Sequence, residues 1–423
     1  MLTRSPRRKY YQTRILVPAS TPADSPQPPA PAREAPPQRV ESLAWTLPAS
    51  DLRRVMRGAR HRERDAPGPA AFRECISTPM KKVVEYLPFP ASRRTALRKK
   101  TVDVVGLGLN ATDTVLIVRH FPALGGKERV VSSSVHVGGQ VATALVTCQR
   151  LGLRTRYIGK VGDDEGGKLQ LASLKHEGMD VRYTRVVPGT PNQFGHILVD
   201  QATGERTVFW DRHARLTVTP DELTEGAITG ARILHLDGCD VEACLQAARW
   251  ARRAGIPVVA DLDTVYKKVE SLFPYIDYLI ASTKFLPTLT GEADPFRVLE
   301  YTANEYQMKA PGMTLGRDGA LIYQGGRFHY SPGFVVETVD TTGAGDVFHG
   351  GFIYGLLAGW KIGRALDFAN AMAALNCTAL GARGGIKTQA EAEKLMAHGA
   401  RHANPAYLQN SAGTKQKTAG GRR

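Results

Sequence analysis

The chain is poor in cysteine and in long apolar segments. Its 423 residues include five cysteines, none in a Cys-x-x-Cys pair and none with a histidine at zinc-binding spacing. No apolar run approaches the length of about 18 residues that indicates a membrane-spanning helix. These absences argue against a disulfide scaffold, a zinc module and a membrane protein. They predict a cytoplasmic protein that has no membrane partner.

Acidic residues are scarce in the first quarter of the chain and ordinary elsewhere. Residues 1–100 hold 21 lysines and arginines against 8 acids, whereas the remaining residues hold 35 against 32. Most of the formal charge of +16 therefore belongs to the N-terminal segment. Because the rest of the chain is nearly neutral, the charge gives little reason to expect a nucleic-acid partner.

The same N-terminal segment holds 15 of the 26 prolines, with "TPADSPQPPAPAREAPPQ" at its centre. Such a composition cannot bury enough apolar surface to offset the entropy of ordering, so residues 1–99 are predicted to be a disordered, basic, proline-rich extension. Arginine-rich transit peptides share this bias, but the segment lacks a sustained amphipathic helix and the apolar core of a signal peptide. We favour an extension without a targeting function, with Met80 as an alternative start. Residues 398–423 are predicted to be a polar, basic, disordered tail.

Strand and helix patterns alternate from residue 101 onwards. Short β-rich runs such as "TVDVVGLGL" and "IPVVADLD" are separated by segments with helical spacing, such as "VEACLQAARWARRAG". This rhythm predicts an α/β domain over residues 100–397, with a mostly parallel central sheet flanked by helices. Two stretches, about 113–137 and 193–216, instead have hairpin patterns with glycine-containing turns. We expect them to form a small β-sheet lid over one end of the domain.

The glycine-rich turn in "VDTTGAGDVFHGGF" lacks the lysine that follows the last glycine of a common phosphate-binding loop. Asp346 stands there instead, and the apolar spacing that follows predicts a helix that begins near Ala344. The first amides of such a helix have no intrahelical partner and point toward a docked anion. A phosphoryl acceptor must lose a proton while amides and cations stabilise the phosphate. Asp346 therefore fits the role of the base that takes the acceptor's proton.

Four motifs stand in the order found in one enzyme family. "DTTGAGDVFHGGF" closely resembles the second signature of the PfkB/ribokinase family of sugar and nucleoside kinases, and "GGQVATALVTCQRLG" with "IGKVGDDEGG" resembles the first. "TLGRDGALIY" is similar to the nucleotide-side strand and turn, and "FANAMAALNCTALGARGGI" to the C-terminal helix and loop. The resemblance covers roughly residues 101–395. It implies a ribokinase-like fold and a ribokinase-, fructokinase- or ketohexokinase-like enzyme that uses ATP and Mg²⁺ to phosphorylate a primary sugar hydroxyl.

The resemblance also implies residue roles and partners. Asp346 would be the catalytic base, beside an anion-binding turn formed by Gly343, Ala344 and Gly345. The residues implied for the sugar are Asn110, Asp113, Gly138, Gly139, Gln140, Thr143 and Arg212, although a solvated hairpin charge explains Arg212 equally well. The residues implied along the nucleotide are Ser282, Thr314, Gly316, Gly319 and Asn370. A monovalent cation such as K⁺ would lie near Asp340, Thr342, Asn376 and Gly381, and a homodimer would form through the lid.

Two places differ from the family pattern. Thr143 stands where the first signature usually has asparagine, and Gln140 holds a variable position that often carries lysine or asparagine. Ser282 and Phe285 stand where many members have the ends of an Asn-x-x-Glu motif, which implies an altered water-mediated magnesium network. Some ketohexokinase-like members also lack that motif. A ketose therefore becomes slightly more attractive as the substrate than ribose.

Three further functions stay open from the sequence. "VVGLGLNA" is a formal Gly-x-Gly-x-x-Ala after a strand, and alone it would indicate an NAD-dependent oxidoreductase. A strand rather than a helix at residues 111–118 would argue against that enzyme. The second is a nucleoside kinase of the same family. The third is a catalytically silent member that only binds a sugar or a nucleotide.

Several polar residues outside the motifs have no assigned role. Asp261 and Asp263 end a strand on the side where such folds bind ligands. Either a substrate contact or a role in the turn fits these two acids. His136, His235 and His349 are interpreted as packing or surface residues, because they lie in apolar patterns without metal-binding spacing.

Overall fold

The computed structural model describes residues 100–405. The predictions for the N-terminal extension and for the tail beyond residue 405 lie outside the described residues. Within residues 100–405, no helix is both long and apolar enough to cross a membrane.

A nine-stranded sheet forms the centre of the domain. Its strands are β1 (Val104–Leu107), β4 (Thr155–Gly162), β5 (Asp180–Val187), β8 (Ile233–Leu236), β9 (Val258–Leu262), β10 (Tyr278–Ala281), β11 (Ala310–Thr314), β12 (Ala320–Gln324) and β13 (Arg327–Ser331). They lie in the order β13-β12-β11-β10-β9-β8-β1-β4-β5. The strands from β11 to β5 are parallel, and β12 and β13 are antiparallel at one edge. This is the mostly parallel sheet that the alternating pattern predicts.

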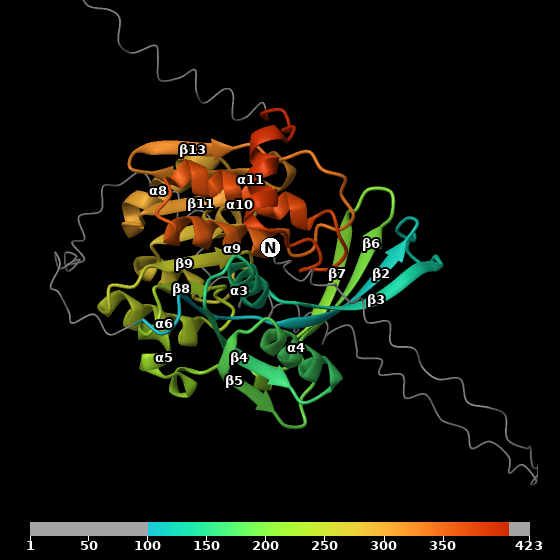
Figure 1. Cartoon of the computed structure of the whole chain (residues 1–423), viewed down its shortest axis with the longest axis horizontal. Helices are drawn as coiled ribbons and strands as arrows, with labels where there is room; N and C mark the ends of the chain where they lie inside the picture. The colour runs from blue at the N-terminus through green and yellow to red at the C-terminus, as the bar shows by residue number, and fades with distance from the viewer. Residues whose placement is uncertain (1–99, 406–423) are drawn as a thin grey trace, which may run out of the picture. The chain divides into compact units, whose positions relative to one another are not determined.

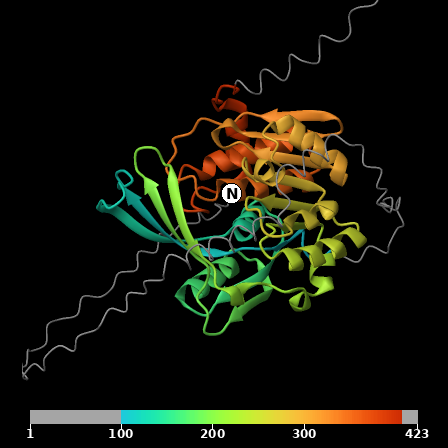
Figure 2. The same cartoon turned by 180° about the vertical axis from the view of Figure 1, so that it is seen from behind.

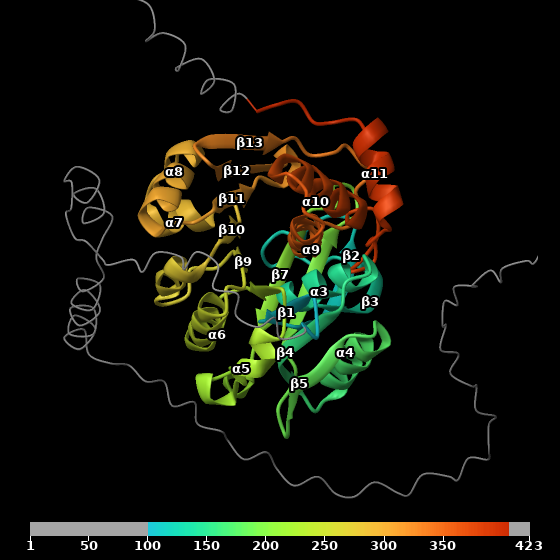
Figure 3. The same cartoon turned by 60° about the vertical axis from the view of Figure 1, so that its left-hand side comes forward.

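Helices cover both faces of this sheet, as Figure 3 shows. They are α3 (Gln140–Arg150), α4 (Glu165–His176), α5 (Glu225–Thr229), α6 (Val241–Arg253), α7 (Phe285–Thr290), α8 (Pro295–Tyr306), α9 (Ala344–Leu357), α10 (Ile362–Asn376) and α11 (Gln389–His398). Short 3₁₀ turns are η1 (Ala214–Leu216), η2 (Pro220–Glu222), η3 (Val269–Tyr275) and η4 (Gly316–Asp318). Helices α5 to α8 share one apolar core, and α3, α9 and α10 share the other. Successive residues of β1 enter opposite cores: Val104 packs with α3 and α9, and Val105 packs with α5 and α6. Such burial on both sides explains the continuous apolar runs of the central strands.

A second, four-stranded sheet stands out from one end of the domain (Figures 1 and 2). Its strands are β2 (Ala111–Val118), β3 (Val130–Gly138), β6 (Phe194–Asp200) and β7 (Arg206–Asp211), in the order β3-β2-β6-β7. Val115, Ile197 and Val199 are buried on its inner face. The ribokinase-like α/β fold with a small additional sheet is therefore confirmed. Because β2 is a strand, the helix that a dinucleotide-binding turn requires is absent there.

One glycine between the small sheet and helix α3 is tightly constrained. Gly139 lies between β3 and α3 with φ of 91°, and a Cβ there would lie 2.2 Å from the Cα of Asn110. Gly152 has the same φ of 91°, but no atom lies within 4 Å of a Cβ built on it. Of these two glycines, Gly139 alone combines an unfavourable backbone angle with a close approach of the main chain.

This difference gives a stability prediction. Both Gly139→Ala and Gly152→Ala strain a left-handed backbone, but only Gly139→Ala also forces Asn110 to move. We expect Gly139→Ala to lower the free energy of unfolding by about 1–3 kcal/mol more than Gly152→Ala. Urea-induced unfolding of both variants measures the difference, and equal midpoints would contradict the described turn.

Candidate active site

A cavity of about 680 Å³ lies where the carboxyl ends of the central strands meet the start of α9. Many residues predicted from the sequence reach its wall from several elements. They are Gln140, Ser282, Thr314, Gly316, Gly319, Gly343, Ala344, Gly345, Asp346 and Asn370. In open α/β sheets ligands bind at this end of the strands. Asp261 and Asp263, at the end of β9, lie in the same wall.

Helix α9 begins at Ala344, as predicted, and its first turn faces the cavity. The residue before it, Gly343, has a left-handed conformation with φ of 75°. A Cβ on Gly343 would lie 2.4 Å from the carbonyl oxygen of Ala382. Only glycine allows this close approach, which seats the turn against the loop that follows α10. The amides of the first helical turn are thereby held toward the cavity.

The four residues implied for a monovalent cation come together behind this turn. Asp340 is fully buried, and its carboxylate accepts hydrogen bonds from the backbone amides of Thr342 and Gly381, both at 2.8 Å. The Asn376 side chain donates to the carbonyl oxygens of Thr342 and Ala382, both at 3.1 Å. Asp340 and Asn376 thus tie the turn to the loop after α10. Among the described residues, the buried Thr342 hydroxyl is left without a partner.

Asp346 lies half-buried in the first turn of α9. Burial raises the pKa of its carboxyl to about 7, and the nearby Asp263 carboxylate acts in the same direction. The positive charges of Arg206 and Arg383 act in the opposite direction. A carboxyl group whose pKa lies near neutrality can take up a proton during a reaction and release it afterwards.

Asp261 lies in the same cavity wall as Asp346. Burial, followed by repulsion from Asp346, raises the pKa of Asp261 well above its ordinary value. The Gln140 side chain hydrogen-bonds Asp261, and the ring of His349 lies 3.3 Å from its Oδ2 atom. His349 is 1% exposed and lies on α9, one turn after Asp346. The sequence interpretation left both packing and a surface position open for His349, and nothing in its context indicated a contact with a cavity acid.

On the sugar side, polar groups are buried at the junction of the two sheets. The Asn110 amide nitrogen donates to the Tyr157 hydroxyl at 2.8 Å and to the Lys160 carbonyl at 2.7 Å. Its Oδ1 atom is buried without a partner among the described residues. Asp113 projects from β2, where burial raises its pKa to about 6. A Cβ on Gly138 would lie 2.6 Å from Asp113 Oδ2, so glycine leaves room for this carboxylate.

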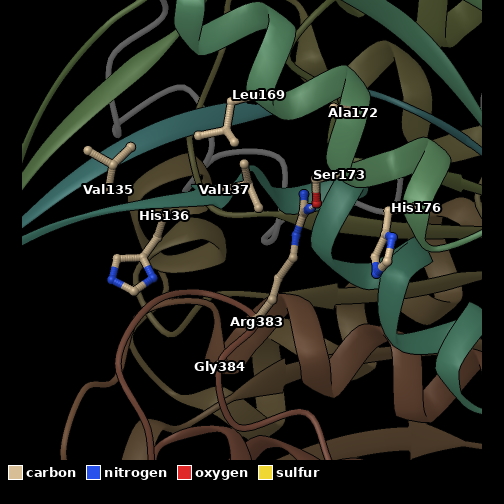
Figure 4. Close-up of a pocket in the computed structure, with 9 residues that line it drawn as sticks. All are labelled: Val135, His136, Val137, Leu169, Ala172, Ser173, His176, Arg383 and Gly384. Carbon is tan, nitrogen blue, oxygen red and sulfur yellow. Dashed lines mark hydrogen bonds between the residues drawn. The ribbon is translucent and has the colours of Figure 1, made fainter. Parts of the chain in front are cut away.

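Thr143 has a supporting position. It is fully buried in α3, and its hydroxyl accepts a hydrogen bond from Arg383 Nε at 3.2 Å. Arg383 also donates to the Gly138 carbonyl at 2.8 Å and to the Ser173 hydroxyl at 3.4 Å. Figure 4 shows its side chain running from the loop after α10 toward Ser173, beside a second hollow of about 510 Å³. Burial lowers the pKa of Arg383 to about 10. Thr143 therefore acts on the glycine turn through Arg383, and it lies outside the wall of the main cavity.

Arg212, which the resemblance implied for the sugar, lies outside the wall of the main cavity. Its guanidinium forms two hydrogen bonds of 2.9 Å with Asp240, at the start of α6, and donates to the Leu216 carbonyl at 2.8 Å. The cavity wall instead contains Arg206, the first residue of β7, which donates to the hydroxyl of Thr341. The family resemblance implied Arg212 for this role, but Arg212 pairs with Asp240, and Arg206 is the arginine of the hairpin that lines the cavity.

The nucleotide-side residues surround a tight turn between β11 and β12. Gly316 and Gly319 flank η4 with φ of 60° and 99°. A Cβ on Gly319 would lie 2.0 Å from the Ser331 carbonyl oxygen. Asn370, on α10, donates to that same carbonyl at 2.9 Å. Thr314 ends β11 beside this turn, so these residues form one continuous wall.

Substitution of the two lid arginines, Arg212 and Arg206, should lower the free energy of unfolding by different amounts. Arg212→Met would leave the buried Asp240 carboxylate without its charged partner, whereas Arg206→Met removes an exposed side chain. We expect Arg212→Met to lower the free energy of unfolding by about 3 kcal/mol and Arg206→Met by less than about 1 kcal/mol. Urea titration of both variants measures this. A larger loss in Arg206→Met would contradict the assigned positions.

Fold and cavity together define a class of protein. Amides at a helix start can bind an anion, and a carboxylate beside them can accept a proton. The small second sheet contributes Arg206 to the cavity wall. Within residues 100–405, no group of three or more metal-binding acids, histidines or cysteines forms a metal cage. This combination is typical of phosphotransferases that act on small hydroxyl compounds.

Comparison with known proteins gives the family. The model described as pfkB family carbohydrate kinase matches residues 100–389. An ATP-dependent ribose-1-phosphate kinase of Halopiger xanaduensis is 30% identical over 287 residues, which cover 67% of this chain and 94% of the relative. A ribokinase of Bacillus subtilis is 28% identical over 300 residues, which cover 70% and 99%. The crystal structure of a ribokinase from Thermotoga maritima matches with a TM-score of 0.59 at 25% identity, covering 70% of this chain and 100% of that one.

The chain therefore belongs to the pfkB family of carbohydrate kinases. It is an ATP-dependent sugar kinase, a phosphotransferase with a sugar hydroxyl as the acceptor. The resemblance inferred from the four sequence motifs is confirmed. The dinucleotide-dependent oxidoreductase is excluded by the same match and by the strand β2.

Proposed function

We propose that the protein transfers the γ-phosphate of ATP to a primary hydroxyl of a sugar, with Asp346 as the base. The observation that carries this proposal is the position of Asp346. It lies in the first turn of α9, in the same cavity wall as the amides that follow Gly343. The sugar oxygen forms a bond to the γ-phosphorus as the bond from that phosphorus to the β–γ bridging oxygen breaks. The hydroxyl proton passes to Asp346, and ADP leaves.

Charge in the cavity supports these separate roles. The amides of Gly343, Gly345 and Asp346 are available to bind an anion in the cavity, whereas the amide of Ala344 donates to the Thr341 carbonyl at 3.3 Å. Arg206 adds a positive charge from the lid side of the cavity. These donors suit the phosphate oxygens, on which negative charge is concentrated during transfer. Asp346 would repel phosphate but accepts a proton from an alcohol. The two groups therefore serve the two reactants.

We place the nucleotide along the wall formed by Thr314, Gly316, Gly319 and Asn370, with Ser282 near the phosphates. Mg²⁺ would neutralise the phosphate charge when bound. Because the described residues form no metal cage of their own, the ion fits a mode in which phosphate oxygens supply most of the ligands. Ser282 and Phe285, which replace the family's Asn-x-x-Glu ends, are consistent with a cation held chiefly by the nucleotide.

A monovalent cation such as K⁺ is proposed behind the anion-binding turn. The unpartnered Thr342 hydroxyl and the carbonyl oxygens near Gly381 are oxygen donors of the kind this cation takes. Each Asp340 oxygen accepts one backbone amide and keeps a further lone pair that can face a cation. Bound there, the cation would strengthen the field that the turn presents to phosphate.

We also propose a homodimer through the lid. Val135 and Phe209 lie in one cross-strand row, through Thr114 and His196, and each is 59% exposed. Phe194 projects from the same face two residues before His196. Exposed apolar side chains gathered on one face of a sheet favour burial against a partner.

The dimer gives a direct test. Phe209→Glu places a charge in the exposed apolar row without touching a buried group, so the protein should become a folded monomer. Sedimentation equilibrium measures the mass of the wild type and the variant. Lys168→Glu, on α4 outside the lid, serves as the surface control. A wild-type monomer would contradict the proposed dimer.

A cytoplasmic location is also proposed. The described cysteines, Cys148, Cys239, Cys244 and Cys377, are free thiols, which suits a reducing compartment. Fractionation of cells that produce the full chain would test it.

The substrate is tested with a panel taken from the relatives. ATP consumption is measured with ribose, ribose 1-phosphate, fructose, 5-dehydro-2-deoxygluconate and adenosine, and the product is identified by ³¹P NMR. Turnover of at least one sugar with phosphate on a primary hydroxyl supports the proposal. Exclusive turnover of adenosine would favour a nucleoside kinase. No turnover of any compound would favour the silent binding protein.

Asp346 gives the sharpest mutational prediction. Asp346→Asn keeps the size of the side chain but cannot accept the proton, so turnover should fall by about 10³-fold or more while nucleotide binding persists. Asp221→Asn, a carboxylate outside the cavity, is the matched control. In the wild type, protonated Asp346 is inactive, so the rate should fall as the pH drops below about 7, the pKa of Asp346. A rate independent of pH around that value would contradict the role of Asp346.

A further inference from the structure

His349 lies beneath the anion-binding turn with both ring nitrogens facing oxygen atoms. Its Nδ1 atom is 2.8 Å from the carbonyl oxygen of Gly345 and 3.3 Å from Asp261 Oδ2. Its Nε2 atom is 3.1 Å from the carbonyl oxygen of Ile280. The ring is 1% exposed, so bulk water cannot satisfy either nitrogen. A neutral imidazole carries one N–H and one bare nitrogen, and the bare nitrogen cannot accept from a carbonyl or a carboxylate.

Counting protons resolves this conflict. Nε2 faces the Ile280 carbonyl, which can only accept, so Nε2 must carry a hydrogen. Nδ1 faces both the Gly345 carbonyl and the carboxyl of Asp261. A second proton on Nδ1 satisfies both oxygens, whereas a second proton on Asp261 satisfies only the contact between Nδ1 and Asp261. In both arrangements the sum of the charges of the two side chains is zero. An ionised Asp261 beside a neutral histidine would hold one proton fewer and would leave two lone pairs in contact.

We propose that Asp261 and His349 together retain this second proton. The charges of the pair then sum to zero, and Asp261 does not repel the ionised form of Asp346 that acts as the base. This inference rests on the proposed catalytic role of Asp346. Asp261 and His349 do not take the proton of the sugar hydroxyl. The pair acts through charge, because Asp261 is the acid whose ionisation would repel an ionised Asp346 from the same cavity wall.

The surrounding groups define the charge balance. Gln140 hydrogen-bonds Asp261, and the carboxylates of Asp346, Asp263 and Asp237 repel it. Burial together with these carboxylates raises the pKa of Asp261. Burial lowers the pKa of His349 to about 4, against the contacts with the Gly345 and Ile280 carbonyls, which raise it. Both net shifts favour a pair whose charges sum to zero. The positive charges that act on Asp346 are Arg206 and Arg383.

A second buried histidine adds no charge. His235 stacks on His349 with ring centroids 5.8 Å apart, and its Nδ1 atom lies 3.2 Å from the Val259 carbonyl oxygen. Its Nε2 atom has no partner among the described residues, so one N–H satisfies this ring. Burial lowers the pKa of His235 to about 3, which keeps it neutral. It is therefore the matched control for removal of a buried imidazole.

His349 affects the pH at which Asp346 ionises. With His349 present, Asp261 is already neutralised, so Asp263 but not Asp261 repels the ionised Asp346. Without His349, Asp261 and Asp346 compete for protons, and their mutual repulsion raises the pH at which both are ionised. The acid limb of the rate profile should therefore move to higher pH.

Four proteins test this prediction through the pH dependence of kcat. We expect His349→Asn to raise the midpoint of the acid limb by about one pH unit. Asp261→Asn should leave the midpoint within about 0.3 units of the wild type, because it replaces a neutral pair by a neutral amide and imidazole. The double variant should return the midpoint to the wild-type value. His235→Asn, the control, should not move it.

Each arm has a result that would overturn the proposal. If Asp261→Asn lowers the midpoint by about one unit, Asp261 is ionised in the wild type. If His349→Asn lowers kcat equally at every pH and Asp261→Asn does not rescue it, His349 is only structural. The Asp261→Asn arm stands alone if His349→Asn fails to fold.

NMR of the histidine nitrogens, which needs no enzyme turnover, tests this proposal separately from the proposed function. In protein labelled with ¹⁵N-histidine, the His349 signals are assigned by their loss in His349→Asn. We expect Nε2 of His349 to carry a hydrogen across about pH 6 to 9. A bare Nε2, with the hydrogen on Nδ1, would overturn the pair even in an active kinase. Absence of turnover with the expected Nε2 signal would instead contradict only the proposed function.

Discussion

The site depends on the way in which the start of α9 is fixed. Gly343 fits against the Ala382 carbonyl only because it has no side chain, and Asp340 ties the same turn to the amide of Gly381. These contacts hold the first amides of α9 in place before a ligand arrives. Donors that are already aimed at an anion need no rearrangement when charge develops on the transferred group. The central strands and α10 contribute the other residues of the cavity around the start of α9.

The second constraint is that several negative charges must lie close together in one cavity. Asp261, Asp263 and Asp346 share a cavity that must also accept a triphosphate. The helix amides and Arg206 offset the phosphate, while the proton shared by Asp261 and His349 offsets one of the three acids. Arg383 contributes from behind the wall, where it also supports the turn at Gly138. The charge distribution thus separates the acceptor's chemistry from the binding of phosphate.

The sequence predicted much of this arrangement because its central features are local. The alternating strand and helix patterns indicated the sheet, and the spacing after Gly343 indicated the start of α9 at Ala344. Long-range pairing was not predictable in this way. Arg212 and Arg206 stand six positions apart in one hairpin, and only the fold shows that Asp240 pairs with Arg212. The contact between His349 and Asp261 likewise joins α9 to β9, far apart in the sequence, and Thr143 reaches the sugar side only through Arg383.

A transition-state analogue complex tests the central claim most directly. The crystal structure of the protein with ADP, Mg²⁺, the sugar that is turned over and aluminium fluoride would show where the transferred group binds. We predict that the fluoride ligands accept the amides of Gly343 to Asp346, and that the sugar's primary hydroxyl lies within hydrogen-bond distance of the Asp346 carboxylate. An analogue bound away from the start of α9, or a hydroxyl that faces another base, would contradict this account.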